Sequence, residues 1–231
     1  MLKLSLSKLY KLSAVIFATA LALSSSASAY AQQGLNTNFN KFQKPAQVST
    51  PSSSNYQASS CSDLCYGYNY VPLYRFWSNQ YNGHFYTIDE NEKNSVIANY
   101  SNVWSYEGIA YYVEKPTYIN GVYGCYGDPV YRFWSDSLAA HFYTISEPEA
   151  QYVYDNLPSW NYFEGVAFCA FTNPSDAYYM MGSSAKPVYR FWSNPFQNHF
   201  YTISEAEKNA VIANYPDVWN FEGVAYYAGE N

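Results

Sequence analysis

Charged side chains are scarce in this 231-residue sequence, where Asp, Glu, Lys and Arg together make up 13% of the residues. The 12 basic residues are outnumbered by 18 acidic ones, which gives a formal net charge of −6. Proteins that bind nucleic acids use clustered Lys and Arg to neutralise phosphate groups. We therefore expect no nucleic-acid partner.

Long hydrophobic runs are also missing. The most apolar stretch, Leu12 to Leu23, has about 12 residues, whereas a membrane-spanning helix needs roughly 20. Three Lys precede this stretch, and Ala-Ser-Ala (27–29) and Ala-Tyr-Ala (29–31) follow it as two alternative cleavage sites. This pattern predicts a signal peptide over residues 1–29, a secreted or periplasmic location, and no membrane span. Cleavage would remove three Lys and no acidic residue, so the mature chain would have a net charge of −9.

Cysteine is limited to four residues, and an even number in an exported chain suggests two disulfides. If the strands that carry Cys125 and Cys169 are antiparallel neighbours, these two residues pair, which leaves Cys61 to pair with Cys65. Cross-pairing such as Cys65–Cys125 remains an alternative. Zinc is the other use of such residues, but Cys61 and Cys65 have no second close pair and no nearby His, so we expect neither a metal nor another cofactor.

Residues 30–60 have little apolar character and no periodicity, and they are rich in Ser, Asn, Gln and Pro. Such a segment cannot bury enough apolar surface to offset the entropy lost on ordering. It is predicted to be a disordered linker that precedes a single domain over residues 61–231.

Aromatic residues are abundant, at 21% of the sequence, and they recur periodically. Segments with the sequence YRFWS begin at Tyr74, Tyr131 and Tyr189, so the spacing is 57 and then 58 residues. Residues 74–112 and 189–227 are identical at 27 of 39 positions without gaps. All six Trp, all three His and all three Arg fall in the three copies. The sequence therefore predicts three repeats, at about 72–113, 129–170 and 187–228.

Each repeat has the pattern of two strands, a short helix and a last strand. The β-prone YRFW segment and the HFYT segment are separated by a six-residue turn. A capping box follows, with Asp89, Ser146 or Ser204 as the N-cap and Glu three residues later. The helix is expected to bury Val96, Ile97 and Tyr100 in the first repeat, and Val211, Ile212 and Tyr215 in the third.

One such repeat has too small a core to be stable alone, so the three must share one. We expect a mainly β fold with short helices, in which three tandem ββαβ repeats close with pseudo-threefold symmetry. A β-trefoil-like arrangement is the first expectation, and a three-bladed, propeller-like ring is the alternative. Closure would also remove exposed strand edges.

The combined motif YRFW, HFYT and Trp-x-x-Glu-Gly-x-Ala-Tyr resembles a tandem repeat family of unknown function over about residues 72–228. That family is found in secreted bacterial and fungal proteins, often as an accessory module beside hydrolase domains. The second repeat departs from the pattern, because Trp160 stands four residues before Glu164 and Cys169 replaces the last Tyr. The resemblance implies no catalytic residues.

The candidate site residues are the polar and aromatic side chains that recur at constant offsets. In one interpretation each repeat has a cleft in which Arg, His and Glu bind ligand groups and Trp provides a stacking face. In the other, which we favour for the polar residues, Arg and Glu form a structural pair between the first and last strands and His binds a backbone carbonyl. The candidates are Arg75, Trp77, His84, Glu107, Arg132, Trp134, His141, Glu164, Arg190, Trp192, His199 and Glu222.

Catalytic signatures such as G-x-S-x-G, H-E-x-x-H or a P-loop do not occur in the sequence. The paired Glu residues near each helix start are explained by the capping box. We therefore expect no enzyme but a secreted binding module, with carbohydrate or a cell-wall polymer as its partner. The first alternative is a structural or protein-interaction module of the envelope or matrix, and the second is a hydrolase that acts on glycans or cell walls.

Overall fold

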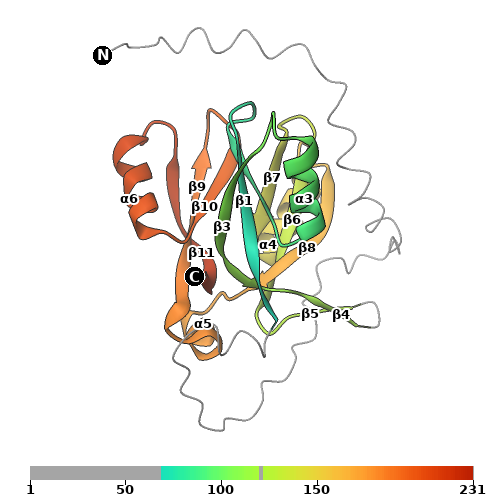
Figure 1. The fold of residues 1–231 in the computed structure, drawn as a ribbon, viewed down its shortest axis with the longest axis vertical. Helices are drawn as coiled ribbons and strands as arrows, with labels where there is room; N and C mark the ends of the chain where they lie inside the picture. The colour runs from blue at the N-terminus through green and yellow to red at the C-terminus, as the bar shows by residue number, and fades with distance from the viewer. Residues whose placement is uncertain (1–68, 120–121, 231) are drawn as a thin grey trace. The chain divides into compact units, whose positions relative to one another are not determined.

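The computed structural model describes residues 69–119 and 122–230 (Figure 1). The predicted signal peptide, the predicted linker, Cys61 and Cys65 lie outside these residues. Unit 1 (residues 70–114) comprises β1 (Tyr70–Ser78), β2 (Gly83–Thr87), α3 (Glu90–Asn99) and β3 (Ser105–Glu114). Unit 2 (residues 128–170) comprises β6 (Asp128–Ser135), β7 (Ala140–Thr144), α4 (Glu147–Asn156) and β8 (Tyr162–Ala170). Unit 3 (residues 185–229) comprises β9 (Ala185–Ser193), β10 (Asn198–Thr202), α6 (Glu205–Asn214) and β11 (Asn220–Gly229).

The segments between units carry further elements. β4 (Thr117–Ile119) and β5 (Val122–Gly124) form a separate hairpin between units 1 and 2. Helix α5 (Pro174–Met181) and the 3₁₀ turn η4 (Gly182–Ser184) lie between units 2 and 3. Cys125 and Cys169 form a disulfide, which joins the segment before β6 to the end of β8. No helix among the described residues is long and apolar enough to span a membrane.

The main sheet has nine strands, all antiparallel to their neighbours. Within each unit the first strand is central and pairs with both the second and the last strand. In the described part of the chain, strand pairing between units involves single residue pairs. Gly229 of β11 pairs with Tyr112 of β3, and Glu114 of β3 pairs with Cys169 of β8. Phe171, which directly follows unit 2, forms a bridge to Tyr227 of unit 3. The prediction of a mainly β fold with short helices is therefore confirmed.

The helices begin at the predicted caps. Asp89 accepts hydrogen bonds from the backbone of Asn91 and Glu92, and Ser146 and Ser204 each accept one from the Glu three residues later. The expected burial was wrong for several side chains, because Ile97, Ile212 and Tyr215 are 41%, 43% and 56% exposed. A helix of ten residues packs one narrow face against its hairpin, and adjacent residues point about 100° apart around the helix axis.

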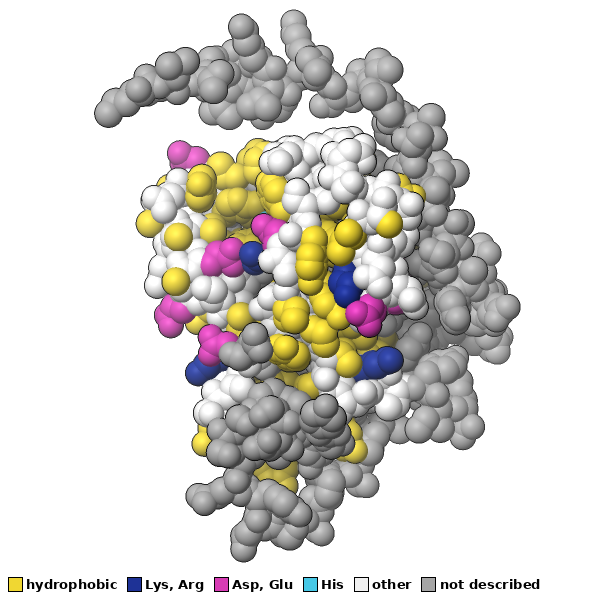
Figure 2. All heavy atoms as spheres, viewed as in Figure 1, with side chains coloured by type: hydrophobic (Ala, Val, Ile, Leu, Met, Phe, Trp, Pro, Cys, Tyr) yellow, Lys and Arg dark blue, Asp and Glu magenta, His cyan; other side chains and the backbone are white. Residues whose placement is uncertain are grey.

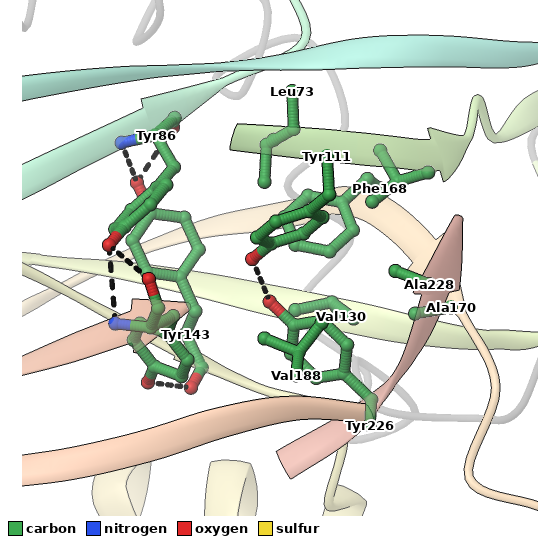
Figure 3. Close-up of a cluster of buried hydrophobic side chains, with 12 residues drawn as sticks. Leu73, Tyr86, Tyr111, Val130, Tyr143, Phe168, Ala170, Val188, Tyr226 and Ala228 are labelled. Atoms are coloured by element: carbon green, nitrogen blue, oxygen red, sulfur yellow. Dashed lines mark hydrogen bonds between the residues drawn. The ribbon is translucent and has the colours of Figure 1, made fainter. Parts of the chain in front are cut away.

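Twelve buried side chains form the core shared by the three units, and each unit contributes four of them at equivalent positions (Figure 3). They are Leu73, Tyr86, Tyr111 and Val113 of unit 1, Val130, Tyr143, Phe168 and Ala170 of unit 2, and Val188, Tyr201, Tyr226 and Ala228 of unit 3. Because the three units bury these side chains together, we expect the stability of each unit to depend on the other two.

Three buried tyrosines of this core connect the units in a cycle. The hydroxyl of Tyr86 donates to the carbonyl of Tyr201 at 2.9 Å, that of Tyr201 to Tyr143 at 2.6 Å, and that of Tyr143 to Tyr86 at 2.8 Å. Each hydroxyl is fully buried, so its hydrogen bond offsets the cost of removing it from water. The second strands of the three units thus meet through side-chain to backbone contacts.

Candidate functional site

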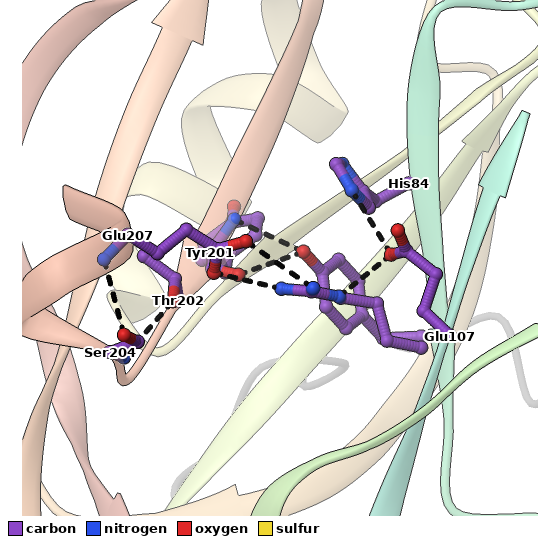
Figure 4. A network of polar contacts seen from close by, with 8 residues as sticks. His84, Glu107, Tyr201, Thr202, Ser204 and Glu207 are labelled. Carbon is purple, nitrogen blue, oxygen red and sulfur yellow. Dashed lines mark hydrogen bonds and ion pairs between the residues drawn. The ribbon is translucent and has the colours of Figure 1, made fainter. Parts of the chain in front are cut away.

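Each unit contributes an arginine that contacts two glutamates, one from its own last strand and one from the helix of another unit. In unit 1, Arg75 Nε lies 2.8 Å from Glu107, and its terminal nitrogens donate to Glu207 of unit 3 at 3.0 and 3.3 Å. His84 and Glu107 lie on one side of this network and Glu207 with its helix cap Ser204 on the other (Figure 4).

The same arrangement occurs in the other two units. Arg132 of unit 2 contacts Glu164 at 2.8 Å and Glu92 of unit 1 at 3.3 Å. Arg190 of unit 3 contacts Glu222 and Glu149 of unit 2, both at 2.8 Å. The three clusters therefore link unit 1 to unit 3, unit 2 to unit 1, and unit 3 to unit 2. We refer to these as the 1–3, 2–1 and 3–2 junctions, each named with the unit of its Arg first.

A glycine in the last strand orients the glutamate toward the arginine. Gly108 follows Glu107 and pairs with Arg75, next to a shift in register between β1 and β3. Its φ of +102° is accessible to glycine and rarely to other residues, and Gly165 and Gly223 have the same conformation in units 2 and 3. The resulting bulge places Glu107 on the arginine face of the sheet, while Tyr106 and Ile109 are 42% and 44% exposed.

The histidine of each cluster contacts the glutamate and not a backbone carbonyl, so that expectation was wrong. The distance from His Nε2 to the carboxylate is 3.4 Å for His84 and 3.3 Å for His141 and His199. Each ring packs beside the Trp that it faces across the hairpin and beside a Phe of another unit, and its Nδ1 is buried without a hydrogen-bond partner in the described part of the chain. Nε2 is thus the nitrogen that donates to the carboxylate in each cluster.

The electrostatics favour charged carboxylates in all three clusters. The hydrogen bond from His84 is the main influence on Glu107 and, with Arg75, lowers the pKa of that carboxyl group. Burial opposes the charge of Glu164, but attraction to Arg132 and His141 prevails and lowers its pKa to about 2. The pKa of Glu222 is lowered in the same way, against its desolvation, by His199 and Arg190. Burial also lowers the pKa of His84 and His199, so these rings stay neutral.

The second glutamate of each cluster was not predicted from the sequence. Glu92, Glu149 and Glu207 were assigned to capping boxes, and their backbone N–H groups do donate to the caps. Their side chains instead reach the arginine of another unit. The available signal was a constant offset, since each of these residues follows the arginine of its own unit by 17 positions.

The tryptophans divide into two groups. Trp104 and Trp160 are buried at 8% and 7% exposure, and each packs against a Phe of the second strand in its own unit. This first group also includes Trp219, which packs against Phe200 in unit 3 but is only half-buried. Trp160 fills the same place as Trp104 despite its shifted position in the sequence. Trp77, Trp134 and Trp192 are half-buried beside their histidines, and their Nε1 groups donate to Asn79, Asp136 and Asn194 at 2.9, 2.7 and 2.8 Å.

Large apolar side chains are also exposed on the molecule, and hydrophobic side chains cover much of the face seen in Figure 2 between isolated charged groups. Units 1 and 3 carry similar sets along the helix and the last strand. Unit 2 differs because all of its exposed large apolar side chains are tyrosines. The exposed residues of the three units are Ile97, Tyr106 and Ile109, then Tyr152, Tyr154 and Tyr162, then Ile212, Tyr215, Phe221 and Val224.

In a comparison with known protein families, the chain matches a family described as Domain of unknown function (DUF5648), over residues 46–171 and 122–229. The chain belongs to this family. Both matched ranges include unit 2, and together they include all of the candidate site residues. No curated protein and no solved structure matches the chain at a significant level. Among residues 69–119 and 122–230, no group of three or more His, Cys, Asp and Glu side chains is placed to hold a metal ion.

Proposed function

We propose that the protein is an exported, non-catalytic binding module whose ligand is a carbohydrate or cell-wall polymer. The observation that carries this proposal is that the polar side chains of each junction are paired with one another, whereas the tryptophan is not part of these pairs. Arg, His and Glu contact one another, while Trp77, Trp134 and Trp192 remain half-exposed with their ring orientations fixed by hydrogen bonds. A fixed, partly exposed indole face is suited to stacking on a sugar ring.

The state of the carboxylates supports a non-catalytic role. Hydrolysis of a glycosidic bond needs a carboxylic acid that is protonated near neutral pH beside a second carboxylate. Glu107, Glu164 and Glu222 have lowered pKa values and are paired with arginine, so they are poor proton donors. Burial raises the pKa of Glu114, but this carboxylate accepts hydrogen bonds from the backbone of Tyr126 and Gly127 and belongs to no junction.

We also propose that the three units close into a ring with pseudo-threefold symmetry. The cycle of tyrosine hydrogen bonds and the cycle of Arg–Glu contacts support this arrangement. The matched family is, in this proposal, the tandem repeat family that the motifs resemble. Its two matches end at residues 171 and 229, and these positions differ by 58 residues, as do Tyr131 and Tyr189.

Export is supported by the N-terminal sequence pattern and by the Cys125–Cys169 disulfide, because disulfides persist mainly in oxidising compartments. The alternative of a structural module would need the tryptophans to serve only as core. Their partial exposure favours binding.

A sedimentation assay tests the proposal. The full chain is mixed with insoluble cellulose, chitin or peptidoglycan, and we expect depletion from the supernatant with at least one of them. Replacing Trp77, Trp134 and Trp192 together by Leu should abolish the depletion. The matched control replaces Tyr178 and Tyr179 of α5, which are exposed aromatics outside the junctions, by Ser and should bind normally.

A second readout does not depend on the folding of the triple variant. Polymer fragments added to the unmodified protein should protect its tryptophan fluorescence from quenching by acrylamide. Binding that survives the triple substitution in a folded protein would contradict the proposal, and so would the absence of both depletion and protection with every polymer.

A further inference from the structure

The 2–1 junction carries an aromatic pair that the other two junctions lack. Trp134 of β6 stands opposite Tyr162 of β8 in the register of the sheet, so the two rings lie on the same face. Trp134 is half-buried and Tyr162 is 49% exposed. Ser105 and Asn220 occupy the position of Tyr162 in units 1 and 3.

A carboxylate lies beside the two rings. Asp136 accepts a hydrogen bond from Trp134 Nε1 at 2.7 Å, and its interaction with Tyr162 raises the pKa of the tyrosine hydroxyl. Units 1 and 3 have the neutral residues Asn79 and Asn194 at this position, and these amides accept from Trp at 2.9 and 2.8 Å. A carboxylate is therefore not needed to hold the indole.

The negative charge of Asp136 is not balanced locally. Within the described part of the chain, no Lys or Arg forms an ion pair with it. The neighbouring cluster adds to the negative potential, because Arg132 is outnumbered there by Glu92 and Glu164. His141 connects the aromatic pair to the Arg132 cluster, because its ring centre lies 4.7 Å from that of Trp134 and its Nε2 lies 3.3 Å from Glu164.

We propose that unit 2 holds the principal binding site and that this site takes a sugar bearing a protonated amino group. The sugar ring stacks on Trp134 and Tyr162, and its ammonium group binds Asp136. Aromatic faces attract cations as well as C–H groups, and a carboxylate forms a charge-assisted hydrogen bond with an ammonium group. This inference rests on the proposed carbohydrate-binding function and specifies its ligand class.

The test compares a glucosamine tetramer with an N-acetylglucosamine tetramer, which lacks the positive charges. Binding to the full chain is measured by titration calorimetry at low salt and about pH 6, below the usual range of amine pKa values. We expect the glucosamine tetramer to bind at least roughly tenfold more tightly, as a charge-assisted contact implies. Asp136→Asn, which introduces the residue of units 1 and 3, should remove this preference without lowering the melting temperature.

A graft into unit 1 provides the reciprocal variant. Asn79→Asp with Ser105→Tyr should create a second site, so that the number of glucosamine tetramers bound per chain doubles. Trilysine is the control for charge alone and should bind at least tenfold more weakly than the glucosamine tetramer.

The outcomes separate this inference from the proposed function. Equal affinity for the two tetramers, or a preference that persists in a folded Asp136→Asn variant, would overturn the amino-sugar site while leaving carbohydrate binding intact. Trilysine binding as tight as that of the glucosamine tetramer would overturn the sugar component. If neither tetramer binds and no polymer is depleted in the sedimentation assay, the proposed function itself fails.

Discussion

Unit 2 and its two neighbours build the same polar cluster with different degrees of burial. The side chain of Arg132 is 12% exposed, compared with 19% for Arg75 and 20% for Arg190. Glu164 is 19% exposed, and its counterparts Glu107 and Glu222 are both 31% exposed. The more deeply buried a charged pair is, the more a lost partner costs, because the remaining charge is less hydrated. The three junctions thus form an internal series in which chemistry is constant and burial varies.

The units also differ on the face of the sheet opposite the arginines. In units 1 and 3 the ammonium groups of Lys93 and Lys208 lie 4.3 and 4.5 Å from the ring centres of Tyr74 and Tyr189. Unit 2 has Ala150 at this helix position, and Tyr131 is only 2% exposed. Units 1 and 3 therefore cover the first tyrosine of the YRFW segment with a cation, whereas unit 2 covers it with a closely packed helix.

The largest expected effect is that of removing the buried arginine of unit 2. Arg132→Ala leaves Glu92 and Glu164 facing each other without a cation, and we expect a loss of about 3–5 kcal/mol in the free energy of unfolding. Arg190→Ala removes the same contacts at a more exposed junction and should cost less. Denaturant titration of both variants measures the difference. Losses of less than about 0.5 kcal/mol, typical of surface substitutions, would show that the clusters are not structural.

The next effect is a loss of stability in acid. The pKa of Glu164 is lowered to about 2 in the folded protein, and an unfolded Glu has a pKa of about 4.3. The charged carboxylate therefore stabilises the fold above about pH 4.3, and this contribution is lost as the pH falls toward 2. We expect it to amount to about 3 kcal/mol, at about 1.4 kcal/mol per pKa unit.

Unfolding curves measured across this pH range test the expectation. Glu164→Gln should make the stability less dependent on pH between about 4.3 and 2. Glu230→Gln serves as the control, because Glu230 is 53% exposed and lies 4.0 Å from Lys186, and it should retain the pH dependence of the parent protein. A Glu164→Gln variant with an unchanged profile would contradict the assignment.

The smallest expected effect concerns the turn before the second strand. Asn82, Ala139 and Gln197 occupy equivalent positions there with φ of +50°, +49° and +53°. This left-handed conformation is tolerated better by Asn than by Ala. Ala139→Asn should therefore stabilise the protein by about 0.5 kcal/mol, and Asn82→Ala should destabilise it by a similar amount. Calorimetric melting temperatures that fail to move in opposite directions would show that the two turns differ in more than this residue.

Much of the local structure could be predicted from the sequence because the determinants are local. The YRFW and HFYT segments, the caps at Asp89, Ser146 and Ser204, and the Glu-Gly motif all depend on neighbouring residues in the chain. Helix α5 was not predicted, although Asn173 followed by Pro174 is a recognisable start, with the Asn side chain accepting from Ser175.

The predicted pair of each Arg with the Glu of its own last strand is confirmed, but its second partner could not be predicted in the same way. The strand pattern places Arg190 and Trp192 on one face but does not reveal that the helix of unit 2 supplies Glu149. Glu92, Glu149 and Glu207 satisfy a local rule as capping residues, and this rule concealed their long-range contacts. The exposure of Ile97 and Ile212 similarly depends on how the helix meets its hairpin, which the apolar pattern alone does not determine.

The cyclic Arg–Glu contacts have a consequence for how the gene could be rearranged. Arg132 and Arg190 reach glutamates 40 and 41 residues earlier in the chain, whereas Arg75 reaches one 132 residues later. The contact has the same chemistry in all three cases, so its formation does not depend on the order of the units in the chain. A circularly permuted chain that begins with unit 2 or unit 3 would preserve every junction, and only the identity of the long-range contact would change.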